Sequence, residues 1–494
     1  MSMIQVSHLT FEYEGTFDLV FEDVSFQIDT DWKLGFVGRN GRGKTTFLRL
    51  LMGEYPYQGH IASSVAFDYF PFIVKRQERD TLEVLEGLAP EAEEWEFYRE
   101  LSKLEVEADV LFRPFSTLSG GEQTKVLLGA LFLKQNNFLL LDEPTNHLDV
   151  QARYTVGRYL QSKKGFILVS HDRTLLDLCT DHTLSINKKN IEVQKGSFSS
   201  WQENKDRQDA YELAKNERLK KDIKRMEEAA KRTARWSDKV EGTKCGTRNS
   251  GLRPDRGYIG HQAAKMMKRS KAIEGRQEEA VREKKALLQN IDEADALKMA
   301  PLSYPKQVLA HLVDVSVFYG ETMAAGPVSF EVKRGERIAL CGKNGCGKSS
   351  VLRLLAGETL SHTGIVELGS GLVISYIPQD TSHLKGDLRQ FARKEGVEES
   401  LFKTILRKLD FSREQFEKDM AGYSEGQKKK VLLSASLCKS AHLYLWDEPL
   451  NYIDVLSRMQ MERVLLQYCP AMVFVEHDST FTEKIATRKI CLDD

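Results

Sequence analysis

Short apolar runs alternate along the chain with segments whose apolar residues recur at helical spacing. The runs KLGFVG, FLLLDEP and FILVSHD have the composition of strands that are buried on both faces. The segment FLRLLMGE, which follows the first of these runs, carries apolar residues at i, i+3 and i+4, as an amphipathic helix does. This alternation predicts an α/β fold with a parallel sheet that is covered by helices on both faces.

The same series of elements occurs twice. GRNGRGKTT at 38–46 returns as GKNGCGKSS at 342–350, and FLLLDEPTNHLDV at 138–150 returns as LYLWDEPLNYIDV at 443–455. The separation between matching residues is nearly constant, which indicates a tandem duplication. We therefore expect two domains of the same α/β type, over residues 1–202 and 301–494.

The segment between the two copies, residues 203–300, has a different composition. Residues 205–239 contain no proline or glycine and are rich in good helix formers, and apolar residues such as Leu219 and Ile223 are spaced as in a coiled-coil seam. After a glycine-rich stretch at 241–260, apolar residues recur at every seventh position. This pattern predicts an antiparallel helical hairpin with its tip at about 241–260. A helix of ~35 residues, at 1.5 Å per residue, would project about 50 Å.

Charge is unevenly distributed along the chain. The 494 residues carry 71 Lys+Arg and 72 Asp+Glu, a net charge of −1, but residues 205–290 hold 24 basic against 14 acidic side chains. A basic projection on an acidic body favours nucleic acid as a partner. A solvated helical spacer is the alternative interpretation.

Nothing in the composition indicates a membrane or an oxidising compartment. No apolar run approaches the ~18–20 residues of a membrane span, and the first residues lack the pattern of a secretory signal. The seven cysteines are scattered, which fits a reducing environment. We expect a cytoplasmic protein that has no membrane partner.

Two glycine-rich loops fit the pattern G-x-x-x-x-G-K-[ST] between a strand and a helix, which is the context of a phosphate-binding loop. Backbone N–H groups and the helix N-terminus would surround the phosphates, with Lys44 and Lys348 reaching the β- and γ-phosphates. The hydroxyls of Thr45 and Ser349 would bind Mg²⁺. The residues expected at the phosphates are Gly38, Asn40, Gly41, Gly43, Lys44, Thr45 and Thr46 in the first copy, and Gly342, Asn344, Gly345, Gly347, Lys348, Ser349 and Ser350 in the second.

An Asp-Glu pair follows a buried strand in each copy, at Asp142–Glu143 and at Asp447–Glu448. The aspartate would help to hold Mg²⁺, and the glutamate would orient or deprotonate the attacking water. The two glutamates are therefore candidate catalytic bases.

Two further residue types recur at matching positions. His171 and His477 end the next strand of each copy and are candidates for a γ-phosphate contact, because their matched recurrence outweighs the usual structural role of a single histidine. Tyr13 and Tyr319 precede the phosphate-binding loops and are candidates to stack on a nucleotide base. Core packing is the alternative for both tyrosines.

The sequence LSGGEQ, which contains Ser119, Gly120 and Gly121, resembles the signature motif of ATP-binding cassette ATPases, and the resemblance covers the whole chain. Two cassettes without a membrane segment, joined by a long charged linker, resemble the ABC-F class. The resemblance implies Mg²⁺-dependent hydrolysis of ATP to ADP and phosphate, in a monomer with two intramolecular ATP sites. Each site would lie between head-to-tail cassettes.

The resemblance also implies which residues share a site. One site would combine Lys44, Thr45, Asp142, Glu143 and His171 with Ser424 and Gly426 of the second signature. The other would combine Lys348, Ser349, Gln379, Asp447, Glu448 and His477 with Ser119, Gly120 and Gly121. Gln379 matches the Q-loop glutamine, a Mg²⁺ ligand and ATP contact, while Asp149 and Asp454 match D-loop aspartates at the interface.

Two departures from the family pattern fall on the same composite site. The segment YIPQ ends in Gln379, but its counterpart YFPF ends in Phe72, and the second signature has Glu425 where a glycine is usual. A phenylalanine cannot bind Mg²⁺ or water, and a carboxylate repels a triphosphate unless it turns away. We hypothesise that the Lys44 site hydrolyses ATP slowly and that the Lys348 site is the faster one.

Among ABC-F subgroups the chain most resembles the Lsa-type antibiotic-resistance proteins. The resemblance rests on DTDWKLGFVGRNGRGKTT, on the YFPF variant and on WDEPLNYIDV. It implies binding to the E site of the bacterial 70S ribosome, with the linker directed at the P-site tRNA and the peptidyl-transferase centre of the 23S rRNA. The expected outcome is ribosome protection from lincosamides, streptogramin A and pleuromutilins.

The linker tip carries the residues that we expect nearest the drug site. They are Lys244, Arg248, Arg253, Arg256 and Tyr258, of which Tyr258 would stack on a base or pack inside the loop. Two other functions remain open at this point. They are an ABC-F translation factor without a drug role, and the ATPase subunit of an efflux transporter.

Overall fold

The computed structural model describes the chain except for residues 1, 14–18, 146–147, 149, 188–189, 243–264, 266–267, 269–296, 344, 413 and 493–494. It divides into one compact unit, made of Met1–Trp201 and Ala294–Asp494, and a second unit, Gln202–Glu293. None of the helices in the described part of the chain has the length and apolar character to cross a lipid bilayer.

The first cassette is built on two sheets. The larger contains β3 (Lys33–Val37), β5 (Ala66–Phe70), β6 (Asn137–Asp142), β7 (Phe166–Val169), β8 (His182–Asn187) and β9 (Asn190–Lys195). Its strand order is β5-β6-β7-β3-β8-β9, and all neighbours pair in parallel except β8 and β9. The smaller sheet is antiparallel, in the order β2-β1-β4, and contains β1 (Met3–Glu12), β2 (Leu19–Asp29) and β4 (Gln58–Ala62).

Helices cover the larger sheet of the first cassette on both faces. They are α1 (Lys44–Leu51), α2 (Thr81–Leu88), α3 (Glu94–Lys103), α4 (Gly120–Leu131), α5 (Val150–Gln161) and α6 (Arg173–Cys179), with short 3₁₀ turns η1 (Ala108–Phe112) and η2 (Phe115–Thr117). Phe138 and Leu140 of β6 pack into a core with α1 and the antiparallel sheet. Leu139 and Leu141 point the other way, into a core with the remaining helices.

The second cassette repeats this plan. Its larger sheet, in the order β14-β15-β16-β12-β17, is wholly parallel. Its strands are β12 (Arg337–Cys341), β14 (Ile374–Ile377), β15 (Leu443–Asp447), β16 (Met472–Val475) and β17 (Arg488–Cys491). The antiparallel sheet is ordered β11-β10-β13 and contains β10 (Val308–Tyr319), β11 (Thr322–Lys333) and β13 (Ser361–Leu368).

The helices of the second cassette also form two layers. They are α9 (Lys348–Leu355), α10 (Leu388–Lys394), α11 (Glu399–Lys408), α12 (Glu425–Cys438), α13 (Val455–Tyr468) and α14 (Ser479–Ile485), with 3₁₀ turns η4 (Glu414–Glu417) and η5 (Met420–Gly422). Tyr444 and Trp446 of β15 face one core, and Leu443 and Leu445 face the other. The predicted α/β fold, with two tandem cassettes and parallel sheets covered on both faces, is confirmed.

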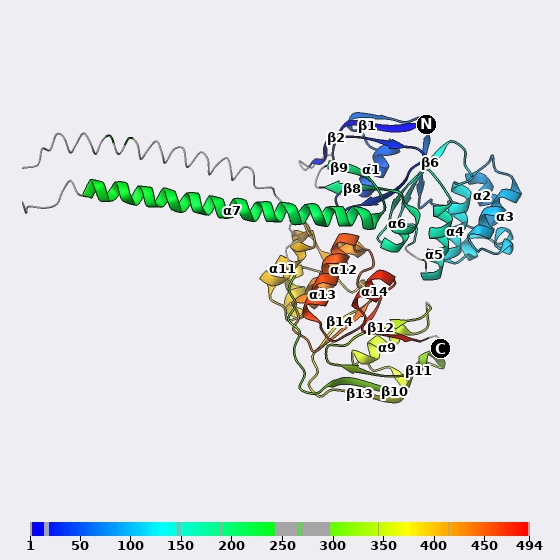
Figure 1. Cartoon of the computed structure of the whole chain (residues 1–494). Coiled ribbons are helices and arrows are strands. Elements are labelled where there is room, and N and C mark those ends of the chain that lie inside the picture. Colours follow the sequence, from blue (N-terminus) through cyan, green and yellow to red (C-terminus); the bar gives the residue numbers. More distant parts are fainter. Residues whose placement is uncertain are drawn as a thin grey trace, which may run out of the picture. The chain divides into compact units, whose positions relative to one another are not determined.

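Helix α7 (Phe198–Gly242) leads out of the first cassette as one unbroken helix (Figure 1). Its first turn belongs to the cassette, since Phe198 and Trp201 are buried in the cassette core. At 1.5 Å per residue its 45 residues span about 68 Å, more than the length expected from sequence. The expected tip and, apart from Lys265 and Lys268, the expected returning helix lie outside the described residues.

Candidate active sites

Both phosphate-binding loops connect a central strand to a helix N-terminus. Gly43 and Gly347, the last residues before α1 and α9, have φ of 97° and 88°, a left-handed conformation that glycine adopts without strain. A Cβ on Gly347 would lie 2.1 Å from the carbonyl oxygen of Ala324, so no larger residue fits there. The loop backbone is therefore free to curl around an anion at the start of the helix.

Both loop lysines are buried and fold back over their own loop. Lys44 Nζ donates to Gly38 O at 2.7 Å, and Lys348 Nζ donates to Gly342 O at 2.8 Å. Carbonyl oxygens are weaker partners for an ammonium group than phosphate oxygens are. The two lysines are thus positioned to exchange these bonds for contacts with a nucleotide.

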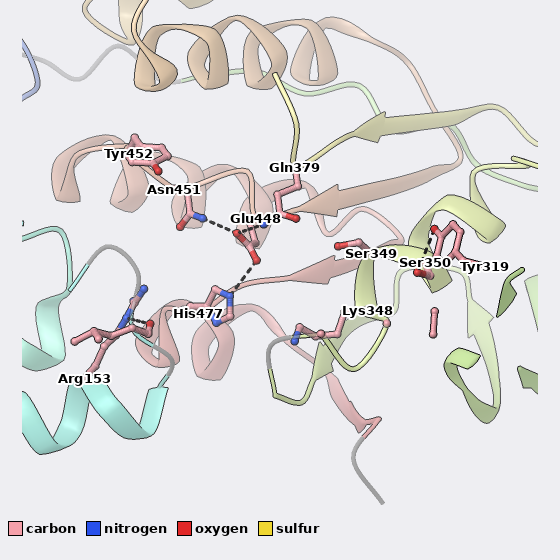
Figure 2. A pocket seen from close by; sticks show the side chains of 14 residues that line it. Arg153, Tyr319, Lys348, Ser349, Ser350, Gln379, Glu448, Asn451, Tyr452 and His477 are labelled. Carbon is pink, nitrogen blue, oxygen red and sulfur yellow. Dashed lines mark hydrogen bonds and ion pairs between the residues drawn. The ribbon is translucent and has the colours of Figure 1, made fainter. Parts of the chain in front are cut away.

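A cavity of about 550 Å³ opens beside Lys348 (Figure 2), within the range of ligand-binding pockets. It brings together most of the residues that the sequence predicts for this site. From the second cassette they are Tyr319, Gly345, Gly347, Lys348, Ser349, Ser350, Gln379, Glu448 and His477. Leu148 and Arg153 of the first cassette also line it, so both cassettes contribute to the cavity.

The carboxylate of Glu448 lies at the centre of a hydrogen-bond network in this cavity (Figure 2). Gln379 Nε2 and Asn451 Nδ2 donate to Oε2 at 3.0 and 2.6 Å, and His477 Nε2 lies 3.0 Å from Oε1. Burial alone would raise the pKa of Glu448, but the bonds from His477 and Gln379 and the charge of Lys429 outweigh burial and lower it. Glu448 is therefore held ionised and oriented, as a general base requires.

Glu143, the matching residue of the first cassette, has a different environment. Its Oε1 lies 3.2 Å from His171 Nε2, and Phe72 stands where the second cassette has Gln379. Burial, followed by the charge of Asp142, raises the pKa of Glu143 to about 8. Burial and the charge of Lys44 hold the pKa of His171 well below its ordinary value. The raised pKa makes Glu143 a poorer acceptor of a proton from water at neutral pH than Glu448.

The residues expected to hold Mg²⁺ fit that role. Both carboxylate oxygens of Asp447 are buried, and neither has a hydrogen bond of good geometry among the described residues, as expected of a group that binds a cation. Asp142 Oδ2 accepts bonds from Thr45 Oγ1 at 2.8 Å and from Tyr69 at 2.9 Å. Mg²⁺ is commonly held by one or two carboxylates together with substrate phosphates. The described residues contain no separate cluster of three or more metal-ligating side chains.

Glu425, the unusual residue of the second signature, is engaged by two partners of its own cassette. Its carboxylate accepts a hydrogen bond from Thr381 Oγ1 and lies 3.0 Å from Lys428 Nζ, and these partners hold its pKa low. The signature glycine that remains, Gly426, is required by space, because a Cβ there would lie 2.8 Å from Tyr452 O. Phe72 is 42% exposed and offers no ligand atom.

The first signature motif and the Lys348 loop line two different cavities in this structure. Ser119, Gly120 and Gly121 line a separate cavity of about 520 Å³, which shares Leu148 with the Lys348 cavity. At the Lys44 loop the cassettes are in direct contact, since Asn40 donates to Tyr452 O at 2.8 Å and to Asp454 at 3.3 Å. Ser424 caps α12 by accepting a bond from Gln427 N.

The two candidate base-stacking tyrosines lie beside their loops, and several other expected residues are not described by the structure. The exposed Tyr13 lies with its hydroxyl 2.6 Å from Thr46 Oγ1, and Ser350 Oγ donates to the Tyr319 hydroxyl at 3.4 Å, so each ring borders its loop. Asn344, Asp149 and the tip residues Lys244, Arg248, Arg253, Arg256 and Tyr258 lie outside the described residues.

Two further groups of functional interest are not among the residues predicted from sequence. Asn451 touches the candidate base, and its signal was available, because asparagine recurs in DEPTN and DEPLN. The other is a buried contact between cassettes, in which Arg173 pairs with Glu462 and lies 3.4 Å from Asp478. No local pattern indicates a partner so distant in sequence.

Comparisons with known proteins identify the family of the chain. The family described as ABC transporter matches residues 21–146 and 325–451. The chain is 27% identical over 490 residues to the ribosome protection protein VmlR of Bacillus subtilis, covering 98% of this chain and 85% of VmlR. It is also 27% identical to the ATP-binding protein Uup of Caulobacter vibrioides, covering 96% of this chain and 75% of Uup.

A solved structure shares the architecture. The archaeal ribosome recycling factor aABCE1, in complex with a ribosomal stalk protein, superimposes with a TM-score of 0.62 at 19% identity, covering 98% of this chain and 87% of that one. The chain belongs to the ABC transporter family, as an ATPase with two tandem ATP-binding cassettes that resembles the ABC-F proteins.

Proposed function

We propose that this ATPase binds the E site of the bacterial 70S ribosome and protects the ribosome from drugs of the peptidyl-transferase centre. Its linker would approach the P-site tRNA and the 23S rRNA and dislodge lincosamides, streptogramin A and pleuromutilins. The observation that carries this proposal is similarity along 98% of the chain to a protein named for ribosome protection. The long helix α7 and the basic linker sequence support a partner made of RNA.

The ATP cycle would drive binding and release. ATP beside Lys348 would draw Ser119, Gly120 and Gly121 to its phosphates, merging the two cavities that now share Leu148. The closed form would bind the ribosome, and hydrolysis would reopen the cassettes and release the protein. A composite site around Lys44, with Ser424 and Gly426, would close in the same way.

Hydrolysis would take place mainly at the Lys348 site. The ionised Glu448 accepts a proton from the water that attacks the γ-phosphate, while Lys348 binds the phosphate oxygens. His477 orients Glu448 and would contact the γ-phosphate. Bound Mg²⁺, held by Asp447, Ser349 and Gln379, would neutralise part of the phosphate charge. The Lys44 site would hold its ATP for longer, since the raised pKa of Glu143 makes it the weaker base at neutral pH.

Rescue of bacterial cell-free translation tests the proposed function. We expect the purified chain with ATP to restore synthesis that lincomycin or tiamulin has blocked, and to leave inhibition by a macrolide unchanged. Charge reversal in the tip, as in Arg253→Glu with Arg256→Glu, should abolish rescue and preserve ATP hydrolysis. Lys348→Ala should abolish both, which separates the RNA-directed step from the ATPase step.

If the chain restores synthesis with none of the three drugs, the protection function is contradicted and the ATPase assignment stays intact. A requirement for the chain in uninhibited translation would identify a general translation factor instead. Lower drug accumulation in intact cells, without rescue of the cell-free system, would indicate the ATPase of an efflux transporter.

A further inference from the structure

The segment that carries Glu448 has a strained backbone. Glu448 has φ of 46° and Tyr452 has φ of 63°, a left-handed conformation that costs a non-glycine residue free energy. Such a conformation persists only where its surroundings fix it. Glu143 of the first cassette has a similar φ of 51°, so the conformation alone does not distinguish the two cassettes. What differs is the set of groups that support the turn Glu448–Tyr452.

One support comes from the next strand of the sheet. Glu476, between β16 and His477, accepts a 2.8 Å hydrogen bond through Oε1 from the backbone N–H of Leu450, in the middle of the strained turn. Burial raises the pKa of Glu476 to about 7, and the charge of Arg458 opposes this rise. Burial of this carboxylate is unfavourable, and its hydrogen bond holds a backbone N–H group beside the active site.

The other support comes from the signature helix α12. Lys429 is only 2% exposed, and its Nζ donates to Pro378 O at 3.1 Å and to Asp447 O at 3.5 Å. These two carbonyls immediately precede Gln379 and Glu448. One buried ammonium group therefore ties together the backbones of the Q-loop and of the strand that carries the base. Burial lowers the pKa of Lys429, and neighbouring carboxylates, Glu476 foremost, oppose this shift.

The first cassette lacks both supports. Thr124 matches Lys429 and Ser170 matches Glu476 in the repeat. The hydroxyl of Ser170 accepts a bond from Asp172 N at 3.1 Å instead, and a threonine is too short to bridge two carbonyls as a lysine does. The cassette that holds its candidate base in a hydrogen-bond network thus has both Lys429 and Glu476. The other cassette has neither a lysine nor a glutamate at the matching positions.

We propose that Lys429 and Glu476 are positioning residues of the Lys348 site, which brace the turn of Glu448 from two sides and fix the geometry of the base. The proposal rests on the proposed role of Glu448 as the base. Neither residue touches the reacting atoms. Their effect should therefore appear in kcat, which depends on the aim of the carboxylate, and not in the binding of ATP.

Replacement by the residues of the first cassette tests this brace. Removing Glu476 alone would leave Lys429 buried with fewer opposite charges, so the charge-matched variant is Lys429→Thr with Glu476→Ser. We expect kcat for ATP hydrolysis to fall roughly 10-fold to 100-fold while KM changes less than about twofold. Glu476→Gln keeps an oxygen acceptor for Leu450 N–H and should retain at least half of kcat. The matched control, Thr124→Ala with Ser170→Ala in the first cassette, should change kcat by less than about twofold.

Hydrogen exchange at the Leu450 amide provides a second readout. It should exchange faster in Glu476→Ser than in the unaltered chain, and at nearly the original rate in Glu476→Gln. Unchanged kcat in the double variant, or an equal loss in Glu476→Gln and Glu476→Ser, would overturn the bracing role. Full turnover in Glu448→Gln would instead overturn the base assignment itself, so the two failures are distinguishable.

Discussion

The side-chain amide of Gln379 donates a 3.0 Å hydrogen bond to the carboxylate of Glu448. In the first cassette the position of this glutamine is taken by Phe72, which can donate nothing to Glu143. One substitution in the repeat thus removes both a partner of the base and an oxygen ligand for the active site. The lowered pKa of Glu448 and the raised pKa of Glu143 are consistent with this difference.

Restoring the glutamine should therefore activate the weaker site. In a Glu448→Gln background, where the Lys348 site is silenced, Phe72→Gln should raise the remaining turnover roughly 10-fold, because the base gains an orienting partner. Phosphate release under ATP saturation measures the change. Phe72→Leu is the control for the loss of the ring, and an equal increase in this variant would contradict the explanation.

The two sites should also differ in their dependence on pH. Glu143 must lose a proton to act as a base, and its pKa of about 8 predicts that turnover in Glu448→Gln rises from pH 6 to pH 9 with a midpoint near 8. The pKa of Glu448 is lowered, so turnover in Glu143→Gln should be nearly flat over the same range. Steady-state rates in a series of buffers of constant ionic strength test this. Two profiles with the same midpoint would contradict the assignment.

The contact between the cassettes contains a buried ion pair that has no counterpart at the matching positions of the repeat. Arg173, Glu462 and Asp478 are all less than 10% exposed, and the residues that match Arg173 and Glu462 in the repeat are Ser479 and Gly157. Helix α13 presses its Val455 and Met459 into the core of the first cassette beside this pair. The contact is therefore asymmetric, although the cassettes are copies.

Breaking this pair from one side should destabilise the protein. Arg173→Met leaves Glu462 buried without its main partner and should lower the free energy of unfolding by about 3–5 kcal/mol. Adding Glu462→Leu to that variant removes the uncompensated charge and should recover most of the loss. Urea unfolding followed by tryptophan fluorescence measures both changes, with Ser479→Ala as the control at the matching position. Additive losses in the double variant would show that the two side chains do not interact.

A second buried carboxylate should govern acid stability in the first cassette. Glu100 is 1% exposed and accepts bonds from Tyr159 at 2.7 Å and Lys103 at 2.9 Å, with Lys163 also bonded. Burial would raise its pKa, but these partners lower it to about 2, below the ordinary value of 4.5 in the unfolded chain. Its contribution is therefore complete above pH 4.5 and is lost as the pH falls from 4.5 to about 2.

Replacement of this carboxylate has two expected effects. Glu100→Gln should lower the free energy of unfolding at pH 7 by roughly 3 kcal/mol, since Lys103, Lys163 and Arg99 lose their carboxylate partner. The variant should also lose less stability than the unaltered chain between pH 4.5 and pH 3. Thermal unfolding at several pH values checks both effects. Parallel curves for the two proteins would contradict the lowered pKa.

The parts of the candidate sites that can be predicted from sequence lie in short contiguous motifs. The glycine-rich loops, the strands that end in Asp-Glu and the matched histidines all follow local rules, and in the second cassette the structure gathers Lys348, Glu448 and His477 at one cavity. The substitution of Phe72 was also visible, because the repeat supplied its own comparison.

Side-chain direction and distant contacts could not be read in this way. Whether Glu425 faces a phosphate depends on Thr381, a residue of another segment, and the sequence gives no distance between them. The pairing of Arg173 with Glu462 and the contact of Lys429 with Pro378 likewise arise only when the chain folds. These contacts decide which of two similar sites has an organised base.

The most direct test of the central claim compares two matched substitutions. The claim is that only the second cassette holds its catalytic base ionised and aimed. ATP turnover at pH 7 should fall roughly 100-fold in Glu448→Gln and less than about twofold in Glu143→Gln. Equal losses in the two variants, or a larger loss in Glu143→Gln, would contradict the claim.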